Sequence, residues 1–235
     1  MARLTRIAAA DLPHHVMQVG NNRQPIFLDD QDRQAWRDHL RESSLVAGVE
    51  IHAYVLLENH VHLLATPRRG AAALGRMMQS LGRRYVAAFN RRHGRSGTLW
   101  EGRYRAAVVD PETALMAVMR YIDSHPQRSG LVPEAALYGW SSLAHHLGRR
   151  RDPLITDPPA WWALGNTPFD REAQYRRWLE EGVAVTEARA ISMATRRGWP
   201  IGSDAAKARL AAALGCEVSP RSRGRPRRQP APGVA

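Results

Sequence analysis

Two apolar segments joined by a very short connection constrain the fold of this chain most. Residues 49–57 and 60–66 are both rich in apolar side chains, and only Glu58 and Asn59 lie between them. Apolar segments of this length, separated by a tight turn, pair as antiparallel β-strands. The sequence therefore predicts an antiparallel sheet in the first half of the chain.

The second of these segments carries two histidines on one face. Side chains alternate along a strand, so His60 and His62 point the same way. Two neighbouring imidazoles form half of a metal site. A His-x-His pair also occurs in strands that bind no metal, so a packing role is the alternative.

A predicted helix at residues 110–125 adds two further candidates. Asp110 is suited to its N-cap and Pro111 to its first helical position. Apolar residues recur at helical spacing at Leu115, Val118, Met119 and Ile122. Tyr121 and His125 are four positions apart and share one face of the helix. The alternative for Tyr121 is a packed aromatic ring with its hydroxyl at the surface.

The remaining pattern predicts the other elements of an α+β domain. Further strands and helices are expected at residues 14–19, 31–46, 74–88 and 104–109. In the first helix, Trp36, Leu40 and Leu45 are the candidates for burial. The expected fold is a ferredoxin-like antiparallel sheet with helices on one face, formed by residues 1–132 as a catalytic domain.

Several short segments, taken in order, resemble a known family. They are GNNRQPIF at residues 20–27, HAYVL at 52–56 leading into NHVH at 59–62, FNRRHG at 89–94, LWEGRY at 99–104 and YI at 121–122. In this order and spacing the chain resembles the REP-associated tyrosine transposases, a branch of the single-tyrosine HUH transposase superfamily. The resemblance covers roughly residues 1–150 and is looser beyond them.

The resemblance implies roles for individual residues. His60 and His62 correspond to metal ligands and Tyr121 to the nucleophile. The family usually has asparagine where this chain has His125, and a neutral imidazole is also a good ligand for Mn²⁺. The expected cofactor is a divalent metal ion, Mg²⁺ or Mn²⁺. Glu58 stands where the family commonly has proline.

The implied reaction needs these groups together. A divalent ion offsets the charge of a phosphodiester and orients it, and a tyrosine hydroxyl needs a nearby positive charge or base to react. The resemblance implies a 5′-phosphotyrosyl intermediate and a free 3′-hydroxyl, formed in single-stranded DNA at hairpin-forming or palindromic repeats. This interpretation requires that Tyr121 be neither buried nor turned away from His60 and His62.

The charge of the chain indicates a polyanionic partner. The formal net charge is +12, and between residues 68 and 105 many arginines accompany a single acidic residue, Glu101. The candidates for DNA contact in this part are Arg83, Arg84, Arg91, Arg92, Arg103 and Arg105. A solvated helix face is the alternative. Trp100 is either an apolar anchor under a loop or a stacking platform for bases.

The rest of the chain is expected to be a mainly helical extension, residues 133–218, and a disordered basic tail, residues 219–235. Ser203 is the expected N-cap of a short helix in the extension. In the tail, Arg223-Gly224-Arg225-Pro226 resembles the core of an AT-hook, whose arginines enter a narrow minor groove. A basic tail that binds polyanions without preference is the alternative.

Three functions stay open at this point. The first is a metal-dependent DNA strand transferase that uses Tyr121, acting on single-stranded or hairpin DNA as a monomer or homodimer. The second is a non-cleaving repeat-DNA-binding protein descended from such an enzyme, and the third is a hydrolase that uses water as nucleophile. The single cysteine, Cys216, and the absence of a long apolar segment favour a cytoplasmic, nucleoid-associated protein without a membrane span.

Overall fold

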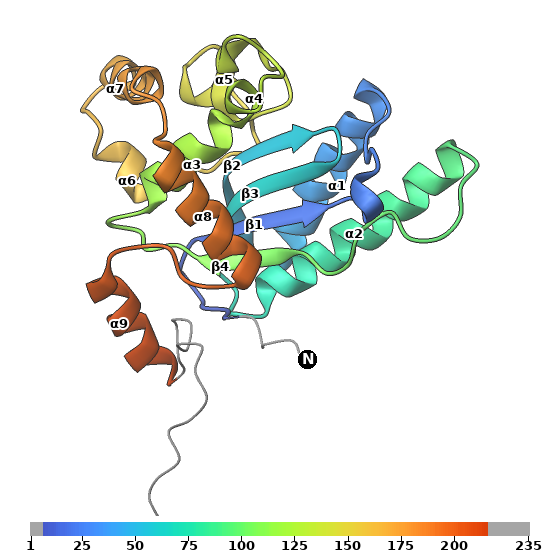
Figure 1. Ribbon diagram of the computed structural model, residues 1–235, viewed down its shortest axis with the longest axis horizontal. Coiled ribbons are helices and arrows are strands. Elements are labelled where there is room, and N and C mark those ends of the chain that lie inside the picture. The colour runs from blue at the N-terminus through green and yellow to red at the C-terminus, as the bar shows by residue number, and fades with distance from the viewer. Residues whose placement is uncertain (1–6, 216–235) are drawn as a thin grey trace, which may run out of the picture.

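A four-stranded antiparallel sheet in the order β2-β3-β1-β4 forms the centre of the molecule (Figure 1). The structure is a computed structural model that describes residues 7–215. Its strands are β1 (His14–Val19), β2 (Val49–Leu57), β3 (His60–Pro67) and β4 (Arg105–Val108). The predicted hairpin is β2 and β3, since Leu57 pairs with His60 across the turn of Glu58 and Asn59. The α+β class expected from the sequence is confirmed.

Two long helices cover one face of this sheet. They are α1 (Asp30–Ala47) and α2 (Ala73–Arg92), which pack on each other and on the strands. Asp29 caps α1 by accepting a hydrogen bond from the backbone N–H of Asp32, and Gly48 ends it with a left-handed φ of 67°. Their core side chains include Trp36, Leu40, Met77, Leu81 and Tyr85.

The prediction that Leu45 is buried was wrong, because its side chain is 68% exposed. The buried positions of α1 follow the helical repeat along one face; they are Asp32, Trp36, Leu40, Ser43, Ser44 and Ala47. Leu45 lies one residue off this face and therefore points to solvent.

The opposite face of the sheet carries the histidines and is covered by α3 (Leu115–Asp123) and α8 (Val185–Arg197). In Figure 1 these helices lie across the sheet from α1 and α2. Val55, Leu64, Val118 and Ile191 belong to the apolar cluster on this side. The sheet is therefore covered on both faces, and the second cover comes partly from the C-terminal half of the chain.

The helix expected at residues 110–125 begins later than predicted, at Leu115. The side chain of Asp110 does accept a hydrogen bond from the backbone N–H of Thr113, at 2.9 Å. That cap closes a turn at residues 111–114 rather than the first turn of the helix. Leu115, Val118, Met119 and Ile122 are buried, as expected.

The extension is helical, as expected. Its elements are η2 (Ala135–Leu137), α5 (Leu143–His146), α6 (Pro159–Trp162), α7 (Pro168–Glu180), α8 and α9 (Asp204–Leu214). Ser203 caps α9 by accepting from the N–H of Ala206. The basic tail at 219–235, with Arg223 and Arg225, lies outside the described residues. Among the helices within residues 7–215, none combines the length and apolarity required to cross a bilayer.

Candidate active site

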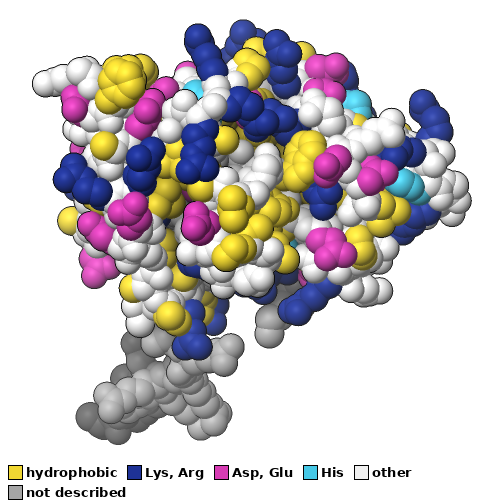
Figure 2. Space-filling model, turned by 90° about the horizontal axis from the view of Figure 1, so that it is seen from above, with side chains coloured by type: hydrophobic (Ala, Val, Ile, Leu, Met, Phe, Trp, Pro, Cys, Tyr) yellow, Lys and Arg dark blue, Asp and Glu magenta, His cyan; other side chains and the backbone are white. Residues whose placement is uncertain are grey.

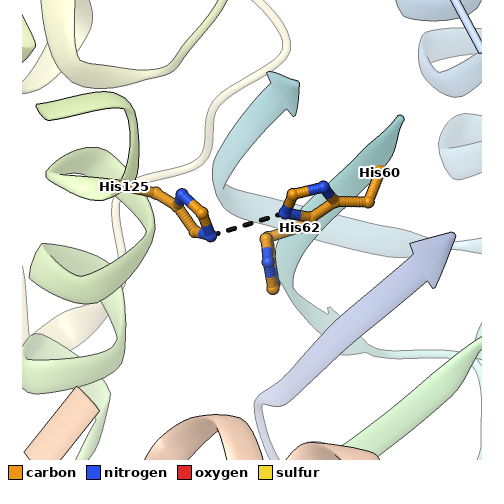
Figure 3. A group of neighbouring side chains, drawn as sticks. All are labelled: His60, His62 and His125. Carbon is orange, nitrogen blue, oxygen red and sulfur yellow. Dashed lines mark hydrogen bonds between the residues drawn. The ribbon is translucent and has the colours of Figure 1, made fainter. Parts of the chain in front are cut away.

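Three histidines from two elements converge on the face covered by α3 and α8. His60 and His62 project from β3, and His125 begins α4 (His125–Arg128), which follows α3 (Figure 3). Their ligand nitrogens all lie within 4.8 Å of one another, and Nε2 of His60 is 3.4 Å from Nε2 of His125. Two nitrogens bound to one ion at about 2.1 Å are about 3 to 3.4 Å apart. The cluster could therefore hold a metal ion.

The protonation of these rings suits a metal site. Burial lowers the pKa of His60 to about 4, helped by the charges of Arg196 and Arg23. Burial also lowers the pKa of His125 to about 3 and holds the pKa of His62 well below its ordinary value. All three rings are neutral near pH 7, so each has a lone pair to offer, and this donor set fits a divalent transition metal such as Mn²⁺.

Tyr121 lies beside these histidines. Its ring centroid is 5.8 Å from that of His62 and 5.9 Å from that of His125, with both pairs close to edge-on. The side chain is only 4% exposed, contrary to the requirement that it should not be buried. This burial could not be predicted from the sequence, because the rings that enclose Tyr121 come from three separate elements, β1, β3 and α4.

The hydroxyl of Tyr121 is not among the buried polar atoms that lack a hydrogen-bond partner. The side chain of Arg128 interacts with it by a hydrogen bond and by charge. The ring is held by the neighbouring rings of His15, His62 and His125.

Arg128 is the cation nearest to Tyr121, and it was not among the residues that the sequence indicated. Its guanidinium carbon lies 4.2 Å from the centroid of the tyrosine ring, and Nη2 donates to the carbonyl oxygen of Tyr121 at 2.7 Å. Burial lowers the pKa of Arg128, while Tyr121 opposes that shift. The spacing of seven residues, two helical turns, was the only sequence signal for this contact.

His15 and Thr195 were also missed. On β1, Nε2 of His15 lies 2.9 Å from Nδ1 of His62. Nδ1 of His15 lies 2.7 Å from Oγ1 of Thr195 on α8. The alternation of β1 indicates which side His15 occupies, but the pairing of β1 with β3 cannot be seen in the sequence. Thr195 is 180 positions away in the chain.

The predicted DNA-binding arginines divide into two groups. Arg84, Arg92 and Arg105 are ion-paired, with Glu42, with Asp29 and Asp32, and with Glu101, respectively. Arg83, Arg91 and Arg103 are exposed and make no ion pair with any residue from 7 to 215. The sequence around α2 has few acidic residues, but the tertiary structure brings acidic side chains from α1 and its N-cap next to the arginines of α2.

The group on α2 lies on the other side of the sheet from the histidine cluster. The space-filling view in Figure 2, seen from above, shows Lys and Arg side chains gathered near the upper middle of the face in view.

Trp100 is an anchor rather than a stacking platform. Its side chain is 8% exposed and belongs to the core between the sheet and α2. The backbone N–H of Glu101 donates to the carbonyl oxygen of Val19 at 2.9 Å, which holds the loop against β1. His93 pairs with Asp32 at 3.0 Å, which ties the end of α2 to α1.

A buried polar cluster surrounds Asp123, two residues after Tyr121 in the chain. The carboxylate of Asp123 accepts hydrogen bonds from Nδ1 of His146 at 2.6 Å and from the hydroxyls of Tyr175 and Ser142, both at 2.7 Å. Asp123 and His146 are both fully buried. This cluster ties the end of α3, and so Tyr121 and His125, to α5 and α7 of the extension.

Protonation of buried histidines is expected to destabilise the fold in acid. Burial lowers the pKa of His14 from 6.5 to about 4, so below pH 6.5 the unfolded chain binds a proton that the folded chain does not. The free energy of unfolding should fall as the pH drops from about 6.5 to about 4. In urea titrations, His14→Gln is expected to reduce this slope by about 1 kcal/mol per pH unit near pH 5. An unchanged slope would contradict the assignment.

Three histidines that could hold a metal ion thus lie beside a tyrosine, on an antiparallel sheet that helices cover. Comparison with known proteins is specific about the family. The family model described as "Transposase IS200 like" matches residues 8–125, half of the chain. The chain belongs to this transposase family, and its function is of the transposase, DNA-processing kind.

One solved structure agrees in fold. The structure of a REP-associated tyrosine transposase bound to a REP hairpin is 18% identical, with a TM-score of 0.56, and the match covers 68% of this chain and 96% of that one. A protein from Deinococcus radiodurans described as a transposase is 22% identical, with a TM-score of 0.36, over 53% of this chain and 96% of that one. No curated protein matches the chain.

Proposed function

We propose that this protein is a divalent-metal-dependent strand transferase that cleaves and rejoins single-stranded DNA at hairpin-forming repeats through Tyr121. One observation carries the proposal. The ring of Tyr121 lies 5.8 Å and 5.9 Å, centroid to centroid, from His62 and His125, two of the three converging imidazoles. A nucleophile and a site for a Lewis acid thus face the same small volume.

The chain's own residues supply binding, orientation and charge. In the proposed step the oxygen of Tyr121 bonds to a DNA phosphorus, the bond to the 3′ oxygen breaks, the phenol loses its proton to water and the departing oxygen takes one up. The guanidinium of Arg128, over the ring, stabilises the negative charge that develops on the phenol oxygen. A divalent ion on His60, His62 and His125 would offset the charge of the phosphate and orient it.

The covalent product keeps the energy of the phosphodiester, so a second 3′-hydroxyl can reverse the step and rejoin strands. Hairpin DNA is the proposed substrate because the fold matches a transposase that was solved with a REP hairpin. Residues 1–132 are proposed as the catalytic domain. Residues 133–218 are proposed as an extension that helps to cover the second face of the sheet in that domain. Arg223 and Arg225 are proposed to contact the minor groove next to the repeat.

Burial of Tyr121 favours a second candidate, a repeat-DNA-binding protein that no longer cuts. With 4% of its side chain exposed, Tyr121 leaves little room for a phosphodiester unless neighbouring side chains move. Such a protein would still bind hairpins through its arginines. It would form no covalent intermediate.

A single assay separates these two functions. Labelled single-stranded hairpin DNA is incubated with the full-length protein and Mn²⁺, or with EDTA, and then separated under denaturing conditions. The proposed function predicts a protein–DNA adduct with Mn²⁺ only. Intact DNA at protein concentrations that saturate binding would contradict strand transfer and support the second candidate.

The unpaired arginines are expected to carry the salt dependence of DNA binding. Replacing Arg83, Arg91 and Arg103 together by alanine should weaken hairpin binding and reduce the slope of log K against log salt by roughly 2, about 0.7 to 0.9 for each lost phosphate contact. Fluorescence anisotropy over a salt series measures this slope. Arg84→Ala is the matched control, because Glu42 already pairs with that charge, and it should change the slope less. If Arg84→Ala reduced the slope as much as each of the three substitutions does on average, the assignment of the DNA contacts to the unpaired arginines would be contradicted.

A further inference from the structure

A chain of three hydrogen bonds runs from the extension to the candidate metal centre. Oγ1 of Thr195 donates to the carbonyl oxygen of Ile191 at 3.0 Å, and the same atom lies 2.7 Å from Nδ1 of His15. Nε2 of His15 then lies 2.9 Å from Nδ1 of His62. His15 is fully buried and Thr195 is 1% exposed, so water does not compete for these bonds.

The contact between the two rings is a hydrogen bond rather than stacking. The rings of His15 and His62 are within 17° of parallel, and their centroids are 5.0 Å apart. The nitrogens are much closer than the centroids, at 2.9 Å, so the rings meet edge to edge, nearly in one plane. A bond of this kind requires a proton on one nitrogen and a lone pair on the other.

The proton on Thr195 links the tautomers of the two rings. The hydroxyl of Thr195 has one proton, and when that proton goes to the carbonyl oxygen of Ile191, the hydroxyl oxygen accepts from Nδ1–H of His15. His15 then has a bare Nε2, and the proton in its bond to His62 must sit on Nδ1 of His62. Nε2 of His62 is left with a lone pair, the form in which an imidazole binds a metal.

We propose that Thr195 is a positioning residue for the metal centre, acting through His15 to hold His62 in the tautomer that leaves Nε2 free for a divalent ion. This inference rests on the proposed metal-dependent function. It assigns to the extension, and to helix α8 in particular, a direct part in preparing the site. His60 has the same arrangement with a local acceptor, since its Nδ1 lies 2.7 Å from Oδ1 of Asn59.

The alternative proton arrangement shows why Thr195 decides the outcome. If its hydroxyl donated to Nδ1 of His15, then Nε2 of His15 would donate to His62, and Nε2 of His62 would carry the proton that an ion has to displace. Thr195→Val removes the acceptor that Nδ1–H of His15 needs. Buried N–H groups without a partner are rarer than buried acceptors without one, so this variant favours the arrangement that blocks His62.

Nitrogen-15 NMR of the metal-free protein, with labelled histidine, tests the tautomers directly. Two-bond couplings between ring protons and nitrogens distinguish Nδ1–H from Nε2–H. We expect His15 and His62 both to carry the proton on Nδ1 in the wild-type protein and in Thr195→Ser. A proton on Nε2 of His62 in the wild-type protein would overturn the inference without any variant.

Calorimetric titration with Mn²⁺ tests the consequence. Thr195→Val should weaken Mn²⁺ binding by about 10- to 100-fold, the usual effect of losing a group that orients a metal-bound histidine, whereas Thr195→Ser should bind as the wild type does. In the His15→Gln background, an amide oxygen can accept from His62 without help from α8. There, Thr195→Val should have no further effect.

The outcomes separate this inference from the proposed function. If the wild-type protein does not bind Mn²⁺, the metal-dependent function fails. If the wild type binds Mn²⁺ and Thr195→Val binds it equally well, the function stands and the role of Thr195 is refuted. A Thr195→Val protein that does not fold is recognised by its NMR spectrum, and the wild-type tautomers then decide.

Discussion

Replacing Tyr121 by phenylalanine is expected to abolish the covalent protein–DNA adduct and to lower cleavage of single-stranded hairpin DNA by at least about 10³-fold. The substitution removes only the nucleophilic oxygen. The ring is held by His15, His62, His125 and Arg128, and phenylalanine keeps these contacts. Arg128, which interacts with the hydroxyl, keeps its hydrogen bond to the carbonyl oxygen of residue 121 in the variant.

The loss of the adduct can therefore be assigned to chemistry rather than to unfolding. Single-turnover cleavage of a labelled hairpin in Mn²⁺ gives the rate, and a urea titration should give a free energy of unfolding within about 1 kcal/mol of the wild type. Hairpin affinity should also be unchanged. Cleavage that persists in Tyr121→Phe would show that water is the nucleophile, and the protein would then be a hydrolase.

Removing the carboxylate of Asp123 is expected to produce the largest loss of stability, about 3 to 5 kcal/mol for Asp123→Ala. This carboxylate accepts hydrogen bonds from Nδ1 of His146 and from the hydroxyls of Tyr175 and Ser142. All of these residues are buried, so alanine leaves three buried donors without their acceptor.

Urea denaturation of Asp123→Ala and the wild type measures this difference. Tyr175→Phe is the matched control: it removes one hydrogen bond to the same carboxylate and should cost only about 1 kcal/mol. A loss of less than 1 kcal/mol in Asp123→Ala would refute the stabilising role of this carboxylate. Because Asp123 follows Tyr121 by two residues, the variant should also loosen the end of α3 that positions the nucleophile.

The interaction of α8 with the histidine face gives the extension a role that its sequence did not suggest. Ile191 packs in the apolar cluster with Tyr121, and Thr195 on the same helix reaches His15. The family model ends at residue 125, before this helix begins. The second cover of the sheet is therefore built by residues that lie beyond the matched part of the chain.

Local sequence signals placed most of the secondary structure. The ends of β1, β2 and β3 follow from alternating or continuous apolar residues bounded by turns, and α1 follows from its Asp29 cap and its repeat of buried residues. The start of α3 was placed too early, because the capping geometry of Asp110 is the same for an isolated turn as for a helix. The burial of Leu45 was misjudged because its apolar side chain was counted without its helical phase.

The ion pairing of the α2 arginines and the burial of Trp100 depended on contacts between segments that are distant in the sequence. The lone acid near the arginines of α2 suggested a free basic face, yet Glu42, Asp29 and Asp32 approach from the neighbouring helix and its cap. Packing likewise decided the alternatives for Trp100, since the side chain fills the core between the sheet and α2. Sequence spacing has no information on such pairs.

By itself, the sequence determined the strand that presents His60 and His62 on one side and the helical face that Tyr121 shares with the segment leading to His125. These follow from the periods of strand and helix, which relate residues a few positions apart. Only the tertiary structure decided that these two faces meet, that Tyr121 is enclosed by neighbouring rings, and that His15 and Thr195 stand behind His62. Those relations depend on strand register and on helix packing across as many as 180 positions of chain, which no local pattern encodes.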